Sequence, residues 1–233
     1  MTGSIDGTGT PSAQVVPAHH IVFQPLVAVR EKTVVGYEAL ARFEDARPPV
    51  AHLAAPPCGL IELELALARS AVAAASAIPR RYAVTINLSA ATIAQPAMRE
   101  ILPPGRRWGI ELLETSMLDA DSRVREHVDD LDAMLLVDDA GSDHASVERV
   151  LELRPDIVKI DKSIVWGACP DERGAADAEL VARLHAFVAA ARRVGARTLA
   201  EGVETEAHRR VAIDAGIDYA QGYLFGPPAP YAG

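Results

Sequence analysis

Acidic side chains recur at the ends of short apolar runs along this chain of 233 residues. The polar residues in or just after these runs are Glu38, Asn87, Glu111, Asp138, Asp139, Lys159, Asp161, Glu201 and Gln221. If the runs are neighbouring strands, these side chains meet in one mouth, where so many negative charges repel one another. Divalent cations with oxygen ligands relieve that repulsion, so we expect one or two Mg²⁺ or Mn²⁺ ions there.

The adjacent pair Asp138–Asp139 makes this prediction more specific. One carboxylate of such a pair can reach inward while the other turns with the backbone, so that two metals share them. Two metals about 3.5–4 Å apart serve phosphodiester hydrolysis. Taken singly, each residue also has a plain structural explanation. An acidic residue after a strand often caps a helix, Lys159 can extend to solvent, and Asn87 can begin a turn.

The elements that must position these residues alternate between short and long segments. The short apolar runs predict strands at Ile21–Val29, Val34–Phe43, Tyr82–Leu88, Trp108–Leu113, Met134–Val137, Ile157–Ile160, Arg197–Ala200 and Tyr219–Phe225. The longer segments predict helices at Leu60–Ala77, Ser122–Asp132, His144–Leu153, Ala178–Val194 and Glu206–Ala215. This alternation predicts an α/β fold, a TIM-like (β/α)₈ barrel of a single domain, with a doubly wound open sheet as the alternative.

Two segments depart from the alternation. Residues 1–18 predict a flexible lead-in, because small polar side chains dominate its start, and a barrel domain over 19–230 follows. The proline-rich piece over 48–57 predicts an irregular connection after the second strand.

Composition excludes several classes of function. The 23 basic against 32 acidic residues give a net charge of −9, which argues against binding of duplex nucleic acid. Two cysteines are too few for a disulfide framework, and no apolar run approaches the roughly 18–20 residues of a membrane span. The chain has no phosphate loop, dinucleotide-binding glycine motif, zinc-protease motif or serine-hydrolase elbow. We therefore expect a cytoplasmic protein that does not bind a membrane.

A series of short motifs then narrows the prediction. In chain order they are Phe23–Pro25, Gly36–Arg42, Ile86–Ser89, Glu111–Glu114, Asp138–Asp139, Val158–Asp161, Ala200–Thr205 and Gln221–Phe225. Together they resemble the motifs of the EAL-domain family, the cyclic di-GMP phosphodiesterases, from about Ile21 to Pro228. The resemblance implies a TIM-like barrel with an atypical first strand that cleaves cyclic di-GMP to linear pGpG.

The resemblance also implies a role for each matching residue. The metal ligands would be Glu38, Asn87, Glu111, Asp138, Asp139 and Glu201. Lys159 would orient or activate the attacking water, with Glu38 and Glu201 as further catalytic residues. Substrate contacts would come from Gln24, Arg42, Asp161 and Gln221, and Glu114 would anchor the loop after the aspartate pair.

That loop departs from the family pattern, which usually reads DDFGTGYSSL. Ala140, Asp143 and His144 stand where the family has Phe, Gly and Tyr. Three functions therefore stay open: an active Mg²⁺- or Mn²⁺-dependent phosphodiesterase, a receptor that binds cyclic di-GMP without useful turnover, and a scaffold for a protein partner. A homodimer is a further expectation, and oxygen ligands do not decide between Mg²⁺ and Mn²⁺.

Overall fold

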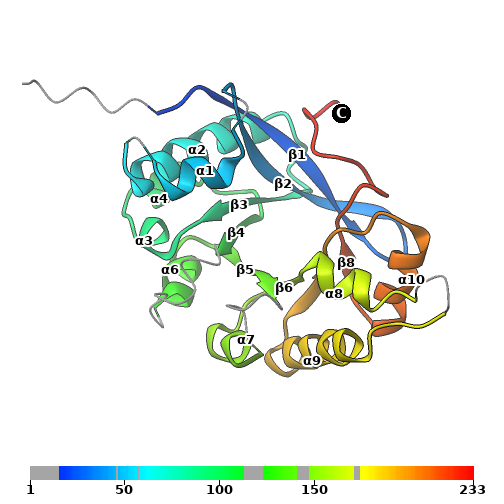
Figure 1. The fold of residues 1–233 in the computed structure, drawn as a ribbon. Helices are drawn as coiled ribbons and strands as arrows, with labels where there is room; N and C mark the ends of the chain where they lie inside the picture. Colours follow the sequence, from blue (N-terminus) through cyan, green and yellow to red (C-terminus); the bar gives the residue numbers. More distant parts are fainter. Residues whose placement is uncertain (1–15, 46, 57, 113–122, 141–146, 171–173) are drawn as a thin grey trace, which may run out of the picture.

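The apolar runs form the strands of one closed barrel in a computed structural model, which describes residues 16–45, 47–56, 58–112, 123–140, 147–170 and 174–233. The strands are β1 (His19–Ala28), β2 (Thr33–Phe43), β3 (Ala83–Leu88), β4 (Trp108–Leu112), β5 (Ala133–Ala140), β6 (Ile157–Ile160), β7 (Arg197–Ala200) and β8 (Tyr219–Ala220). They follow one another around the barrel in chain order (Figure 1). The predicted barrel is thus confirmed, and the open sheet is excluded. Residues 1–15 of the predicted lead-in lie outside the described residues.

The first strand runs against its neighbours. β1 pairs antiparallel with both β2 and β8, whereas the pairs from β2 through β8 are parallel. The connection from β1 to β2 covers only residues 29–32, which suffices for an antiparallel hairpin but not for a parallel crossover. The atypical first strand implied by the resemblance is therefore present.

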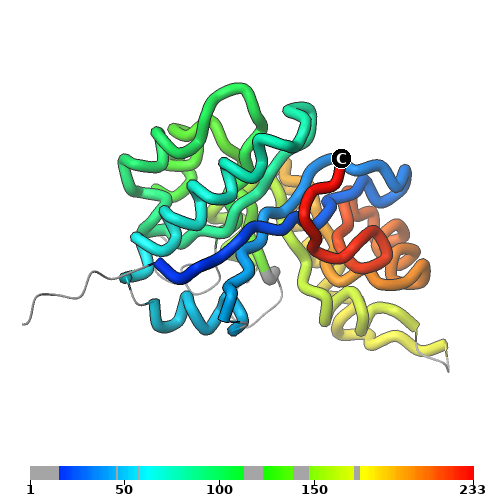
Figure 2. Tube along the Cα trace, turned by 90° about the horizontal axis from the view of Figure 1, so that it is seen from above, coloured from blue at the N-terminus to red at the C-terminus, as the bar shows by residue number. Residues whose placement is uncertain are grey.

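Helices surround the barrel (Figures 1 and 2). They are α1 (Pro49–Ala54), α2 (Leu60–Ala75), α3 (Ala90–Ile93), α4 (Met98–Ile101), α6 (Val124–Asp130), α7 (Val147–Leu153), α8 (Lys162–Gly167), α9 (Ala178–Val194) and α10 (Glu206–Ala215). The bounds of α9 and α10 match the prediction because the residues that begin and end both helices are recognisable in the sequence. Asp177 caps the start of α9 and Gly195, at φ 80°, ends it, and Thr205 and Gly216 do the same for α10. Among the described residues, no helix is both long and apolar enough to cross a membrane.

Two predictions about the elements were wrong. The eighth strand ends at Ala220 rather than Phe225, because the chain at Gly222 passes so close to Val203 that a Cβ there would lie 2.3 Å from the Val203 backbone nitrogen. Gln221 therefore follows the strand instead of lying within it. The proline-rich piece contains the helix α1, because Pro49 occupies the first turn, where a missing N–H costs no hydrogen bond. The short helices α3, α4 and α8 were not predicted.

The barrel interior has an apolar layer beneath the polar mouth. Leu26, Leu136, Ile157 and Leu199 form one buried cluster inside the barrel. Side chains alternate between the two faces of a strand, so the residues two positions further along β5, β6 and β7 point inward at the next level. Those residues are Asp138, Lys159 and Glu201. The alternation therefore places this apolar layer directly under the predicted catalytic groups.

Candidate active site

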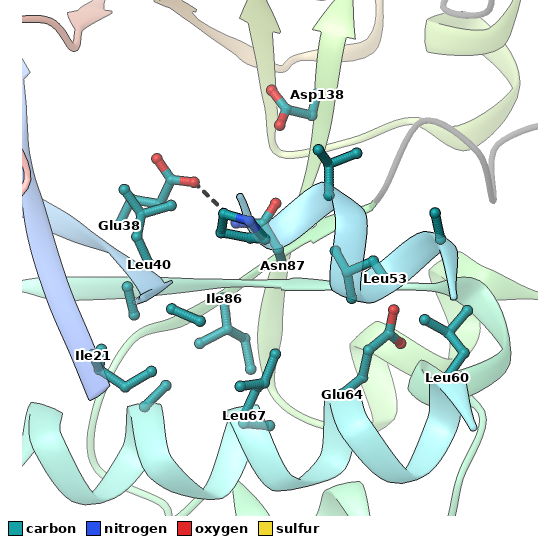
Figure 3. A pocket seen from close by; sticks show the side chains of 17 residues that line it. Ile21, Glu38, Leu40, Leu53, Leu60, Glu64, Leu67, Ile86, Asn87 and Asp138 are labelled. Carbon is teal, nitrogen blue, oxygen red and sulfur yellow. Dashed lines mark hydrogen bonds between the residues drawn. The ribbon is translucent and has the colours of Figure 1, made fainter. Parts of the chain in front are cut away.

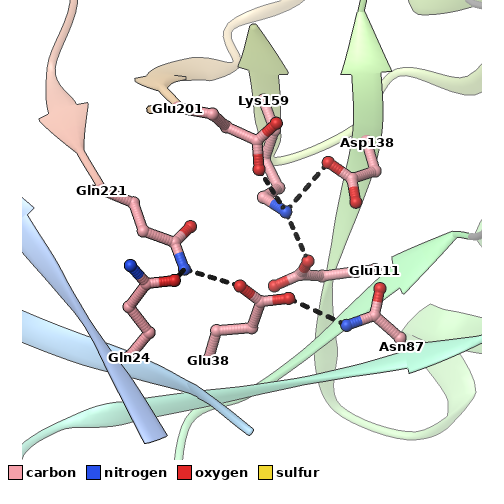
Figure 4. Close-up of polar contacts among 8 residues, drawn as sticks. All are labelled: Gln24, Glu38, Asn87, Glu111, Asp138, Lys159, Glu201 and Gln221. Carbon is pink, nitrogen blue, oxygen red and sulfur yellow. Dashed lines mark hydrogen bonds and ion pairs between the residues drawn. The ribbon is translucent and has the colours of Figure 1, made fainter. Parts of the chain in front are cut away.

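Eight polar side chains, each in or directly after one of the eight strands, meet at the mouth of the barrel (Figure 4). We call this set the polar ring: Gln24, Glu38, Asn87, Glu111, Asp138, Lys159, Glu201 and Gln221. Parallel strands end at the same edge of a barrel, which explains why residues far apart in sequence converge there. Seven of them are among the polar residues found at strand ends in the sequence, and Gln24 is the one implied by resemblance alone.

Lys159 holds one half of the ring together. Its Nζ lies 2.7 Å from Glu111 Oε2, 2.8 Å from Asp138 Oδ1 and 2.8 Å from Glu201 Oε1. The Lys159 side chain is only 1% exposed and that of Glu111 is fully buried. Three carboxylates from three different strands thus share one ammonium group away from bulk water.

Glu38 organises the other half through amide groups. Asn87 Nδ2 donates to Glu38 Oε1 at 2.9 Å, and Gln221 Nε2 donates to Glu38 Oε2 at 2.6 Å. Gln221 Nε2 also lies 3.0 Å from Gln24 Oε1. The Glu38 carboxylate is therefore held by neutral amide donors, and the Lys159 ammonium group acts on it at longer range.

Burial and mutual repulsion change how these groups hold protons. Desolvation, followed by repulsion from Glu38, raises the pKa of Glu111 to about 8, although Lys159 opposes the shift. Burial also raises the pKa of Glu201 well above its ordinary value. Burial alone would lower the pKa of Lys159, but attraction to Asp138, Glu111 and Glu201 raises it well above its ordinary value. Lys159 is therefore a permanent cation, and the two glutamates can take up protons.

The ring has the donor chemistry for hard divalent cations. It offers four carboxylates and the amide oxygens of Asn87 and Gln221, against one ammonium group. Among the described residues, Glu111 Oε1 and Gln221 Oε1 are buried without a hydrogen-bond partner, as oxygens reserved for a cation would be. Across the same residues, no three Asp, Glu, His or Cys side chains are yet arranged to hold a metal, and three of the carboxylates surround Lys159 instead. The residues fit a metal site by charge and donor type.

An apolar cavity of about 420 Å³ opens beside the ring (Figure 3). Its walls come from β2, α1 and α2, and it shares Glu38, Asn87 and Asp138 with the mouth. The helix α1 forms one side and is anchored by His52, whose ring stacks on Phe43 with centroids 3.8 Å apart. An extended ligand can therefore place one part in the polar ring and another against apolar side chains.

Glu64 on α2 is the one carboxylate buried in this cavity wall outside the ring (Figure 3), among the described residues that line it. Its Oε2 accepts from the Ser89 backbone N–H at 3.0 Å and from the Ser89 hydroxyl at 2.6 Å. Its Oε1 is buried and has no hydrogen-bond partner in the described part of the chain. Sequence reasoning missed Glu64, although a glutamate on the apolar stripe with Leu60, Leu67 and Ala68 was a usable signal.

The remaining predicted site residues lie outside the hydrogen-bonded ring. Arg42, on β2, donates to the carbonyl of Ala41 at 2.9 Å. Asp161, directly after β6, caps α8 by accepting from the Ser163 N–H at 2.8 Å, which is the plain structural role open to it. Asp139 lies on β5, but its side chain is outside the described structure, and Glu114 lies outside the described residues altogether. Their predicted roles stay predictions.

Comparison with known proteins places this geometry in a family. The family model of the EAL domain matches residues 18–228. The chain belongs to the EAL-domain family. Two curated Escherichia coli (strain K12) relatives of this EAL domain are the cyclic di-GMP phosphodiesterase PdeL, 28% identical over 228 residues, and the probable cyclic di-GMP phosphodiesterase PdeD, 26% identical over 227 residues. The matches cover 89% of this chain, but only 61% of PdeL and 41% of PdeD.

Solved structures share the barrel of this EAL domain. Klebsiella pneumoniae BlrP1, in a complex with calcium and cyclic di-GMP, superposes with a TM-score of 0.78 at 24% identity and covers 94% of this chain and 58% of that chain. A standalone EAL protein from Vibrio cholerae O395 bound to cyclic di-GMP gives a TM-score of 0.73 at 22% identity, covering 92% of this chain and 94% of that one. At these identities the likeness establishes the fold.

Proposed function

We propose that this EAL domain is a metal-dependent phosphodiesterase that hydrolyses cyclic di-GMP to linear pGpG. The observation that carries the proposal is the polar ring, in which three carboxylates surround the buried Lys159 and Glu38 lies beside them, next to an apolar cavity. The relatives named as cyclic di-GMP phosphodiesterases support the substrate, and the complex of BlrP1 with manganese and cyclic di-GMP supports the cation.

The proposed metal ligands are the residues that supply oxygen donors at the strand ends: Glu38, Asn87, Glu111, Asp138, Asp139 and Glu201. A pair of Mg²⁺ or Mn²⁺ ions bound there would lower the pKa of water and offset the charge that develops on the phosphate. The high pKa of Glu111 supports this assignment, since a group that needs nearby positive charge to ionise gains most from a cation.

Lys159 and Glu201 have complementary proton chemistry in this proposal. Lys159 stays protonated among its carboxylates, so it acts as a charged donor that orients the attacking water and stabilises the transition state. Glu201, which contacts the same ammonium group, is proposed to accept the proton that this water loses. Glu38, held by Asn87 and Gln221, is proposed as a further catalytic residue.

The apolar cavity is proposed to hold one guanine base of the substrate. Guanine carries two neighbouring donors on its pairing edge, N1–H and the N2 amino group, and Glu64 in the cavity wall has a buried carboxylate oxygen, Oε1, that lacks a hydrogen-bond partner among the described residues. A buried acceptor without a partner strongly favours a ligand that supplies a hydrogen-bond donor over one that does not. Gln24, Arg42, Asp161 and Gln221 are proposed to contact the remainder of the dinucleotide.

A product assay tests the proposal. The purified chain is incubated with cyclic di-GMP and Mg²⁺ or Mn²⁺, with a chelator and the Glu38→Ala variant as controls, and products are separated by chromatography. We expect pGpG that depends on metal and on Glu38. Tight binding without product would instead favour a receptor, for which the departures at Ala140, Asp143 and His144 are the sequence argument. Neither binding nor product would favour a protein-binding scaffold, and size-exclusion chromatography checks the proposed homodimer.

A further inference from the structure

The ammonium group of Lys159 occupies the place where carboxylates converge. Three oxygens, each from a different strand, lie 2.7–2.8 Å from Nζ. The contact with Glu111 is a hydrogen bond, and those with Asp138 and Glu201 are ion pairs. The side chain is buried to 1% exposure, which keeps the attraction from being screened by water and salt.

The oxygens that Lys159 binds belong to residues that a divalent cation also needs. Glu111, Asp138 and Glu201 are three of the six proposed metal ligands. Glu38 lies aside, held by Asn87 and Gln221. A bound cation must therefore share these carboxylates with the ammonium group, through their other oxygens such as the unpartnered Glu111 Oε1, and lie close to it as a like charge.

We propose that Lys159 is an internal counter-ion that competes with divalent cations for Glu111, Asp138 and Glu201. This inference rests on the proposed function and adds a regulatory consequence to it. Lys159 offsets the repulsion among the carboxylates when no cation is bound. Because its positive charge also repels a divalent cation, it weakens metal binding. The site fills only when the free concentration of divalent cation is high enough to overcome the ammonium group.

A purely structural role for Lys159 predicts the opposite outcome. If Lys159 served only to hold the ring in shape, its replacement would disorder the carboxylates and weaken metal binding. If Lys159 competes with the cation, removal of its charge strengthens metal binding, although turnover is lost. The sign of the change in Mn²⁺ affinity therefore separates the two roles.

The experiment is a calorimetric titration of metal-stripped protein with Mn²⁺. Lys159→Met removes the charge at similar length, Lys159→Gln removes it but keeps a polar group, and Lys159→Arg keeps the charge. We expect both neutral variants to bind Mn²⁺ at least about tenfold more tightly than wild type, and Lys159→Arg to bind no more tightly than wild type. Lys162→Met, at an exposed position three residues on, makes the same change in net charge and should leave the affinity unchanged.

Thermal melts in chelator and across a Mn²⁺ series provide the second measurement. A neutral variant should melt below wild type in chelator and gain more from Mn²⁺, because tighter binding gives a larger stabilisation. Lys159→Gln decides the outcome if Lys159→Met does not fold without metal. Equal or weaker Mn²⁺ binding by a folded neutral variant overturns the inference. The same wild-type preparation is assayed for pGpG, so that failure of the proposed function is recognised separately.

Discussion

The polar ring and the apolar cavity are neighbours with opposite chemistry. The ring gathers four carboxylates and a lysine, of which Glu38, Glu111 and Lys159 are buried, whereas the cavity beside it is lined mainly by aliphatic side chains and has one further carboxylate in its wall, Glu64. They share Glu38, Asn87 and Asp138. The difference suits a ligand with two unlike parts, an anionic group for the ring and an apolar face for the cavity. In the proposed function the first region carries the chemistry and the second the recognition.

The largest effect is expected from removal of the Glu38 side chain, because Glu38 belongs to both the ring and the cavity. In Glu38→Ala, Asn87 and Gln221 lose the carboxylate they bind, and the ring loses a proposed metal ligand. We expect turnover of cyclic di-GMP to fall by about 10³-fold or more, measured as pGpG formation under saturating Mn²⁺. The exposed Glu126 on α6 gives the control: Glu126→Ala should retain wild-type turnover. Full activity of Glu38→Ala would show that the ring is not the catalytic centre.

Glu64 tests recognition without touching the ring. In Glu64→Gln, the Ser89 donors should hold the amide oxygen, so that the NH₂ group takes the place of Oε1 and cannot accept from a guanine edge. We expect binding of cyclic di-GMP to weaken by about 10²-fold, measured by calorimetry. The matched control is Glu62→Gln, on the same helix but exposed, which should bind as wild type does. Unchanged affinity in Glu64→Gln would place the base elsewhere.

Leu53 tests the apolar wall that α1 contributes. It lines the cavity and is half-buried, so that Leu53→Ala removes apolar contact without disturbing the ring. We expect KM to rise about tenfold while kcat stays within about twofold, because a few lost methylene contacts affect binding of the ground state and the transition state alike. Ile61→Ala, on the exposed face of α2, should change neither constant. A loss confined to kcat would contradict the assignment of this wall to recognition.

The smallest expected effect concerns pH. The pKa of Glu111 is about 8 in the folded chain and near its ordinary value of 4.5 when unfolded, so the folded state holds the extra proton between these values. The stabilisation from this group is complete below about pH 4.5 and is lost as the pH rises through about 8. In chelator, we expect the melting temperature to fall by a few degrees more between pH 5 and 8 in wild type than in Glu111→Gln. An equal slope in both proteins would contradict the raised pKa.

Added Mn²⁺ should reverse this trend. A carboxylate must lose its proton to bind a cation, so metal binding competes with protons less as the pH rises. The Mn²⁺-induced rise in melting temperature should therefore be larger at pH 8 than at pH 6. The same rise at both values would indicate that Glu111 is not a ligand.

Most of the barrel was predictable because its signals are local. The strands of a barrel are continuous apolar runs, and α9 shows an apolar stripe bounded by Asp177 and Gly195. The end of β8 was not predictable, because it depends on the contact of Gly222 with Val203, a segment from the preceding strand connection. The helix α1 was missed because its prolines indicate a loop unless the first one falls at the helix start.

The candidate site shows the same limit. Residues at strand ends could be grouped from sequence because parallel strands bring their carboxyl ends together. The ion pairs among these residues could not be predicted from the sequence. Glu111, Asp138 and Glu201 converge on Lys159 because of their side-chain directions within the closed barrel. The cavity could not be predicted from the sequence either, because the segment that forms α1, one of its walls, was expected to be an irregular connection.

The brevity of β8 has a consequence for local opening of the barrel. The regular ladder of β8 with β1 and β7 covers Tyr219 and Ala220, and the seam is continued by separate backbone contacts, the Gln221 N–H to the Ala200 carbonyl at 2.9 Å and the mutual bonds of Phe23 and Ala229. Amide hydrogens near Ala220 should therefore exchange with solvent sooner than those of β3 or β4, even though Ala220 is fully buried. Gln221 follows directly and donates to Glu38, so a bound ligand that fixes Glu38 would slow exchange across the whole seam.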